Sequence, residues 1–138
     1  MSKSKLLAKR DDESSFASSS LKKWNGGITI YGHDMGSLVE SFIGEDEYEF
    51  FYTVKAENIR ELAAALCREQ QMAAAPNGSS EQHIDGLVQA ELVRLQGQEL
   101  DFVFRSLFRK FKGKLNAPDD FSKFCEQRGI PVEFSSWP

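Results

Sequence analysis

The spacing of apolar residues changes its period near the middle of the chain. Every second residue from 48 to 54 is aromatic or β-branched, which predicts a strand with one buried face: Tyr48, Phe50, Tyr52 and Val54. Directly afterwards, apolar residues recur at helical spacing: Ile59, Leu62, Ala63 and Leu66. The sequence therefore predicts a central strand that leads directly into a helix packed on its own sheet.

The helical period returns three more times. The helix after the central strand is expected over about residues 56–72, although Lys55 is a poor residue at a helix start. A second helix should begin at Ser79, which forms a capping box with Gln82. A third, over residues 100–111, has the most regular apolar stripe, and a short fourth begins near Pro118 and ends at Gly129.

Alternating apolar residues also predict strands near both ends of the chain. Residues 28–31 form a short β-rich run that the glycines at 32 and 36 should interrupt. Residues 37–43 suit either a helical turn or a strand, and we expect a strand that closes a hairpin with the central one. Residues 130–134 alternate again, and the prolines around them favour an edge position in the sheet.

These elements predict one domain of the α+β class. Residues 1–20 are polar and rich in serine, so a disordered tail is expected there. Residues 21–138 should form a single two-layer sandwich, with a mainly antiparallel sheet of three to four strands covered by three to four helices. The N-terminal strands and the C-terminal strand should belong to the same sheet.

The composition predicts a cytoplasmic protein. Residues 1–10 contain lysines but lack the apolar run of a secretory signal, and no stretch approaches the roughly 20 apolar residues of a membrane span. Cys67 and Cys125 both lie in helical patterns beside apolar residues, which favours buried free thiols. A disulfide between the two helices is the alternative.

The net charge of −4 is distributed unevenly along the chain. Residues 24–54 contain acidic side chains and no lysine or arginine, and six of these acids are candidates for an acidic partner-binding face: Asp34, Glu40, Glu45, Asp46, Glu47 and Glu49. Trp137, near the end of the last predicted strand, is either a cover for the sheet edge or an exposed interface anchor. We include it among the candidate partner-binding residues.

Motifs for catalysis, cofactors or metals are weak. His33 and Asp34 form the one histidine–acid pair in a predicted loop, which suits either a small hydrolase-like site or an ordinary turn. The two cysteines and two histidines lack the spacing of a zinc site, and no phosphate-binding loop is present. The sequence therefore predicts no catalytic, cofactor or metal residues.

A basic segment closes the most regular helix. It is formed by Arg105, Arg109, Lys110, Lys112 and Lys114. These cations suit either nucleic acid or the negative end of the helix dipole. The negative net charge and the use of nearby aromatic residues in the core argue against nucleic acid.

Three segments of the chain stand out together: ITIYG (28–32), DEYEFFYTVKAEN (46–58) and GIPVEFSSW (129–137). They resemble a set of small, mostly uncharacterised bacterial proteins that are similar to immunity proteins encoded beside polymorphic toxins. The resemblance covers about residues 21–138 and implies an acidic, cytoplasmic α+β protein without catalytic residues.

The sequence therefore predicts a non-enzymatic binding protein, with an immunity protein as the leading hypothesis. Its acidic face would bind a basic protein partner such as a toxin domain, without a cofactor or a membrane. The two alternatives are a small enzyme that uses His33 and Asp34, and a nucleic-acid accessory protein that uses the basic segment at residues 105–114.

Overall fold

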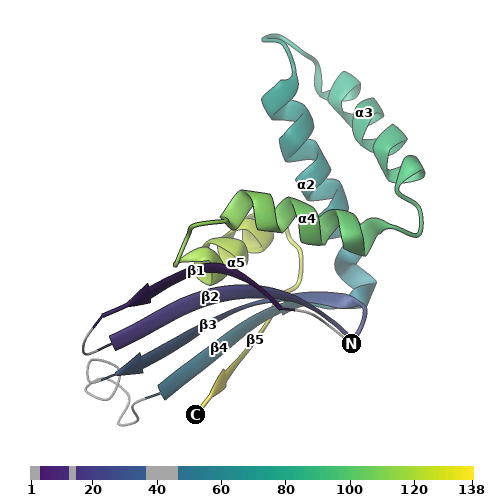
Figure 1. Cartoon of the computed structure of the whole chain (residues 1–138). Helices are drawn as coiled ribbons and strands as arrows, with labels where there is room; N and C mark the ends of the chain where they lie inside the picture. The colour runs from purple at the N-terminus through teal and green to yellow at the C-terminus, as the bar shows by residue number, and fades with distance from the viewer. Residues whose placement is uncertain (1–3, 13–14, 37–46) are drawn as a thin grey trace.

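A five-stranded antiparallel sheet forms one layer of the protein (Figure 1). The computed structural model describes residues 4–12, 15–36 and 47–138. The strands are β1 (Ser4–Asp11), β2 (Ser15–Trp24), β3 (Gly27–Gly36), β4 (Glu47–Val54) and β5 (Glu133–Trp137). They lie side by side in chain order, with every neighbouring pair antiparallel. The described chain is therefore an α+β protein with five strands, where the sequence predicted three to four.

Four α-helices follow β4, all on the same side of the sheet (Figure 1). A 3₁₀ turn, η1 (Ala56–Asn58), leads into α2 (Ile59–Ala74), α3 (Glu81–Arg94), α4 (Glu99–Phe111) and α5 (Ala117–Gln127). α4 and α5 lie over the sheet, whereas α2 and α3 form an antiparallel pair that projects away from it (Figure 1). Among the described elements, all four helices thus lie on one face of the sheet and none covers the other (Figure 1).

The core lies between the sheet and the helices. Its fully buried side chains come from both layers: Leu21, Ile28, Ile30 and Val54 from the strands, and Leu62, Leu66, Val103, Leu107 and Phe121 from the helices. Because strand side chains alternate between faces, Tyr52 shares the covered face with Val54, and its hydroxyl donates a 3.3 Å hydrogen bond to Asp119 of α5. This confirms that the alternating face of the central strand packs beneath the helices.

The N-terminal segment is part of the sheet, so the prediction of a disordered tail over residues 1–20 is wrong for its described residues. β1 and β2 occupy most of that range. Leu7 is buried, and the Ser19 hydroxyl donates a 2.8 Å hydrogen bond to the carbonyl of Lys114. The backbone N–H and C=O groups of the β2 serines form hydrogen bonds with β3. The low hydrophobicity of the segment does not indicate this stabilisation by strand pairing.

The helices agree with the predicted pattern, apart from their first residues. The regular helix predicted at 100–111 is α4, and the short one beginning near Pro118 is α5. The cap of α3 is Ser80, which accepts a hydrogen bond from the backbone nitrogen of His83, rather than Ser79 with Gln82. At Lys55 no side chain caps the helix, and a 3₁₀ turn begins there instead.

The third strand is longer than expected because Gly32 does not interrupt it. β3 continues to Gly36 in unbroken register with β2 and β4. A Cβ atom at Gly32 would lie 2.2 Å from Cζ of Phe50, so this glycine makes room for the neighbouring ring rather than for a turn. The strand or helix predicted at residues 37–43 lies outside the described residues.

Gly27, at the start of β3, should be intolerant of a side chain. A Cβ atom there would lie 2.3 Å from the backbone carbonyl oxygen of Val54, which cannot rotate away. We expect Gly27→Ala to lower the free energy of unfolding by about 1–3 kcal/mol, measured by urea denaturation. Gly86→Ala is the control, since nothing lies near that position in α3, and it should raise stability by about 0.5–1 kcal/mol. An unchanged midpoint for Gly27→Ala would contradict the β3–β4 packing.

Candidate functional site

The side of the sheet that faces away from the described helices, here called the open face, carries exposed and half-buried aromatic and charged side chains. Paired residues in an antiparallel ladder project to the same side, so the register assigns its members. They include Leu6, Phe16, Lys22, Trp24, Tyr31, His33, Met35, Glu47, Glu49, Phe51, Thr53 and Trp137. Trp24 is 52% exposed and Trp137 is 57% exposed.

Aromatic side chains occupy the middle of the open face. The rings of Tyr31 and Phe51 are stacked with their centroids 5.6 Å apart. The Lys22 ammonium lies 5.3 Å from the Tyr31 ring, 5.7 Å from the Phe51 ring and 5.0 Å from the Trp24 ring. The lysine thus lies over an aromatic cluster formed by Trp24, Tyr31 and Phe51.

One end of the open face is acidic. Here His33 of β3 lies beside Glu47 and Glu49 of β4, with its Nε2 atom 2.7 Å from Oε1 of Glu47 and 3.9 Å from Oε1 of Glu49. Phe16 places its ring edge-on to the imidazole, with centroids 6.0 Å apart. Trp137 pairs with Glu49 across β4 and β5. We call His33, Glu47, Glu49 and Trp137 the acidic end.

The structure brings together three of the seven predicted partner-binding residues. Glu47, Glu49 and Trp137 meet at the acidic end, and Trp137 is an exposed side chain. Asp34 follows His33 in β3, so it projects from the covered face. The remaining three, Glu40, Glu45 and Asp46, lie outside the described residues.

His33 and Asp34, the pair named in the alternative enzyme hypothesis, project to opposite faces of the sheet, because neighbouring residues of a strand alternate between its faces. The sequence predicts a loop at both positions, whereas both residues belong to β3. The carboxylates beside His33 are Glu47 and Glu49, which sequence analysis assigned only to the acidic patch. The alternation of β4 shows that the two glutamates share a face, but the register that places His33 opposite them comes only from the sheet.

Asp34 instead lines a small cavity between the sheet and α5, with Arg10, Phe50, Pro118 and Asp119. Burial raises the pKa of the Asp34 carboxyl, and the nearby Asp119 acts in the same direction, whereas Arg10 and His33 oppose them. The ionised form of Asp34 is therefore disfavoured by folding. A carboxylate that docks a basic partner should be exposed and ionised, whereas Asp34 lines a cavity and burial disfavours its ionised form.

Asp34→Asn should therefore stabilise the protein more at neutral than at acidic pH. A carboxyl whose folded pKa lies above its unfolded value binds more protons when folded, so its contribution to stability falls as the pH rises through that interval. We expect urea denaturation to show a larger gain for the variant at pH 7 than at pH 3.

Asp101→Asn is the control for Asp34→Asn, because Lys23 lowers the pKa of Asp101 by hydrogen bonding to it. Its contribution is present at neutral pH and is lost as the pH falls, so this variant should lose stability at pH 7 and little at pH 3. If both variants gained stability at pH 7, or both lost it, the opposite pKa shifts assigned to Asp34 and Asp101 would be contradicted.

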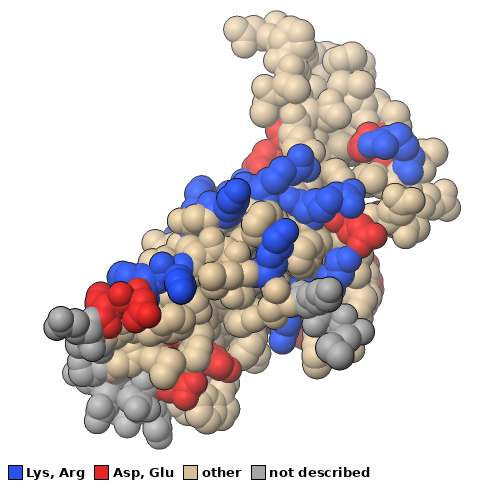
Figure 2. Space-filling model, in the orientation of Figure 1, with Lys and Arg blue, Asp and Glu red and all other residues tan. Residues whose placement is uncertain are grey.

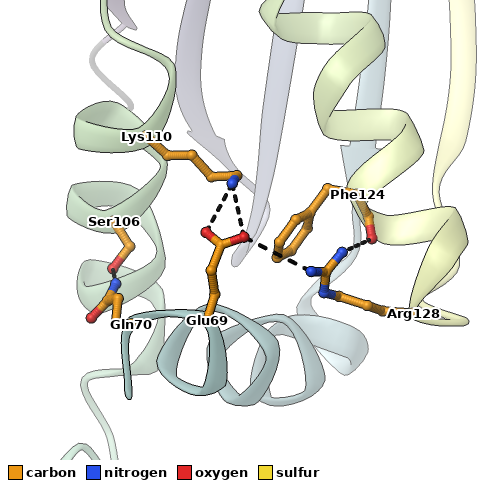
Figure 3. A network of polar contacts seen from close by, with 6 residues as sticks. All are labelled: Glu69, Gln70, Ser106, Lys110, Phe124 and Arg128. Carbon is orange, nitrogen blue, oxygen red and sulfur yellow. Dashed lines mark hydrogen bonds and ion pairs between the residues drawn. The ribbon is translucent and has the colours of Figure 1, made fainter. Parts of the chain in front are cut away.

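The basic segment at residues 105–114 is partly engaged in contacts within the protein. Lys110 of α4 donates to both oxygens of Glu69 of α2, at 2.8 and 3.0 Å, and Arg128 lies 3.8 Å from the same carboxylate (Figure 3). The Arg128 guanidinium also stacks on the Phe124 ring at 3.7 Å. These contacts join α2, α4 and the end of α5, so Lys110 has a structural role in the packing of the helices.

The other cations of that segment are all exposed: Arg105, Arg109, Lys112 and Lys114. Figure 2 shows lysine and arginine side chains forming a band of positive charge over α4 and the adjoining part of the sheet. The Lys112 ammonium lies 6.0 Å from the Phe108 ring, which Lys5 of β1 also covers at 4.1 Å. Nucleic-acid binding by this segment stays the untested alternative hypothesis.

A groove at the other end of the open face is lined by none of the described candidate residues. Trp24, Thr53, Lys55 and Glu133 are among its walls. The Lys55 ammonium and the Glu133 carboxylate form a 2.9 Å ion pair there. Glu57 also lines the groove, so its walls carry one cation and two carboxylates, and the cation is paired with one of them.

Both cysteines are free and buried, as the sequence predicted. Burial raises the pKa of the Cys125 thiol to about 12 and raises that of Cys67 as well. Such thiols are poor nucleophiles at neutral pH. Neither cysteine is therefore a candidate for covalent chemistry.

Comparisons with known protein families, with curated proteins and with solved structures find no match to this chain. The function is therefore argued from the open face itself. In the described ranges, no helix combines the length and the apolar character needed to cross a membrane.

Proposed function

We propose that this protein is a non-enzymatic binding protein that neutralises a basic toxin domain through the acidic end of its open face, as an immunity protein does. The observation that carries the proposal is the joint placement of Glu47, Glu49 and the exposed Trp137 on a sheet face that the helices leave free. Cytoplasmic location, as the sequence predicts, belongs to the same proposal.

Charge supports a basic partner. Glu47 and Glu49 are half-buried on a rigid strand, and in the described part of the chain they pair with His33 rather than with lysine or arginine. The acidic run continues in the sequence through Glu45 and Asp46. Carboxylates grouped in this way attract a positively charged surface and accelerate encounter with it.

Apolar surface supplies the affinity that charge alone does not. Trp137 lies beside Glu49 and is exposed over more than half of its surface, while Tyr31 and Phe51 adjoin the acidic end. Tryptophan and tyrosine are common among the residues that dominate interface energies. An exposed indole bordered by carboxylates suits a partner with a basic rim around an apolar pocket.

Co-expression with the product of the neighbouring gene tests the proposal. The full-length chain should restore growth of cells that produce a toxic neighbour, and the two proteins should copurify as a complex. If the neighbouring product is harmless and forms no complex, the proposed function is wrong.

Charge variants test whether the acidic end is the binding surface. Glu47→Gln/Glu49→Gln should slow association with the toxin by about tenfold at low salt, measured by stopped-flow or surface plasmon resonance. The difference from wild type should shrink as salt rises, because the Debye length falls to about 8 Å at physiological ionic strength.

Glu81→Gln/Glu126→Gln is the matched control, since it removes the same charge from exposed positions on α3 and at α5. It should leave the association rate near that of wild type. Equal slowing by both pairs would show that net charge, and not the acidic end, governs association.

A further inference from the structure

Three side chains at the acidic end have the composition of a metal site. His33, Glu47 and Glu49 each offer one ligand atom, and these atoms lie within 4.8 Å of one another. We propose that they bind a divalent transition-metal ion such as Zn²⁺, through the imidazole Nε2 atom and one carboxylate oxygen from each glutamate. The proposal does not depend on the proposed function.

The strands position these ligands before any ion binds. Glu47 and Glu49 are two residues apart on β4 and share a face, and His33 is the register partner of Glu49 on β3. Sites built on strands hold their ligands more accurately than sites on loops. The Phe16 ring lies against the imidazole in a T-shaped arrangement, with centroids 6.0 Å apart.

The ligand distances bracket those of a small metal ion. Zn²⁺ has bonds of about 2.0–2.2 Å to histidine nitrogen and carboxylate oxygen, which places tetrahedral ligand atoms about 3.3 Å apart. The Nε2 atom of His33 lies 2.7 Å from Glu47 Oε1 and 3.9 Å from Glu49 Oε1. Small side-chain rotations convert the present contacts into a tripod around an ion.

The charges of Glu47 and Glu49 favour the binding of a cation between these side chains. Two carboxylates converge on one imidazole, and within the described ranges neither forms an ion pair with lysine or arginine. With a neutral imidazole, the three side chains carry two negative charges, which a divalent ion balances. The cation also offsets the repulsion between the two carboxylates, which lie on the same face of β4.

The ligand set selects the type of ion. Imidazole nitrogen suits zinc, nickel, copper and iron, whereas Mg²⁺ and Ca²⁺ prefer sites made only of oxygen. Three protein ligands leave the fourth position of a tetrahedral ion open to water or to a partner's side chain. A bound ion would also neutralise Glu47 and Glu49, so metal and a basic partner would compete for them.

Histidine NMR signals provide the test, because the chain contains only His33 and His83. His83 is exposed in the first turn of α3 and acts as an internal control. Titration of the full-length protein with Zn²⁺ should shift the His33 imidazole signals at micromolar concentrations and leave those of His83 unchanged. Mg²⁺ at the same concentrations should shift neither.

Glu47→Gln/Glu49→Gln separates metal binding from a simple effect on the histidine. This variant keeps the His33 signal, and its Zn²⁺ affinity by calorimetry should fall at least about tenfold. Glu133→Gln, which removes a carboxylate from β5, should bind Zn²⁺ as the wild type does.

Several results would overturn the assignment: no Zn²⁺ binding to the wild type at millimolar concentration, a shift confined to His83, unchanged affinity in the double variant, or an equal response to Mg²⁺. Because the test uses the metal alone, its result is independent of toxin binding. Either proposal can therefore be wrong while the other holds.

Discussion

Phe121→Ala is expected to lower the free energy of unfolding by about 3–5 kcal/mol, the largest effect of any single change considered for stability. Phe121 is fully buried, and its ring meets that of Phe111 edge-on with centroids 6.4 Å apart. The side chain therefore joins α5 to α4 above the sheet. Since domains of this size are stable by about 5–15 kcal/mol, its loss removes a large fraction of the total, measurable by urea denaturation.

Phe134→Ala is the matched control, because it makes the same substitution on β5 at a side chain that is 55% exposed. Its effect should stay below about 1 kcal/mol. If Phe121→Ala cost no more than Phe134→Ala, the packing of α5 against α4 and the sheet would be contradicted.

Trp137→Ala is expected to weaken binding of the toxin partner by at least about thirtyfold, which corresponds to about 2 kcal/mol. The indole is exposed in the free protein, so its removal should affect the complex far more than the fold. Isothermal titration calorimetry with the partner should show a raised Kd, while the urea midpoint of the free variant stays near that of the wild type.

Trp24→Ala provides the comparison for Trp137→Ala. Trp24 is equally exposed on the open face, but it lies near the level of Val54, about five residues farther along β4 than Glu49, or roughly 17 Å. It should change the Kd by less than about threefold. Equal losses of affinity in both variants would show that the interface covers the whole open face. A loss of affinity in Trp24→Ala alone would show that the interface lies at the opposite end from Trp137.

The helical half of the fold was predictable because its apolar spacing is a local signal. The stripe from Leu100 to Phe111 identifies α4, and the switch of period after Val54 identifies the junction between β4 and the helices. A last strand at the edge of the sheet was also predicted, and β5 does lie at the edge beside β4. The predicted bounds of 130–134 were too early, because the strand runs over Glu133–Trp137. Each of these signals depends only on neighbours along the chain.

The N-terminal hairpin was missed because its stability is not local. The serines of β2 have little apolar surface, yet Ser19 is fully buried and bonded to Lys114 in the loop that follows α4. Leu21 of the same strand is fully buried in the core. Their backbone groups are satisfied by β1 and β3, which lie on either side. Composition alone suggests disorder for such a segment, since pairing partners do not appear in a composition.

The acidic end shows the same division between local and tertiary information. By itself, the sequence determined the class of the fold, its helices, the acidic run and the shared face of Glu47, Glu49 and Phe51, because side-chain period is a property of one element. Only the tertiary structure decided that His33 faces those glutamates, that Trp137 joins them and that Asp34 does not. Strand register and helix placement set these neighbours, and both depend on contacts between residues far apart in the chain.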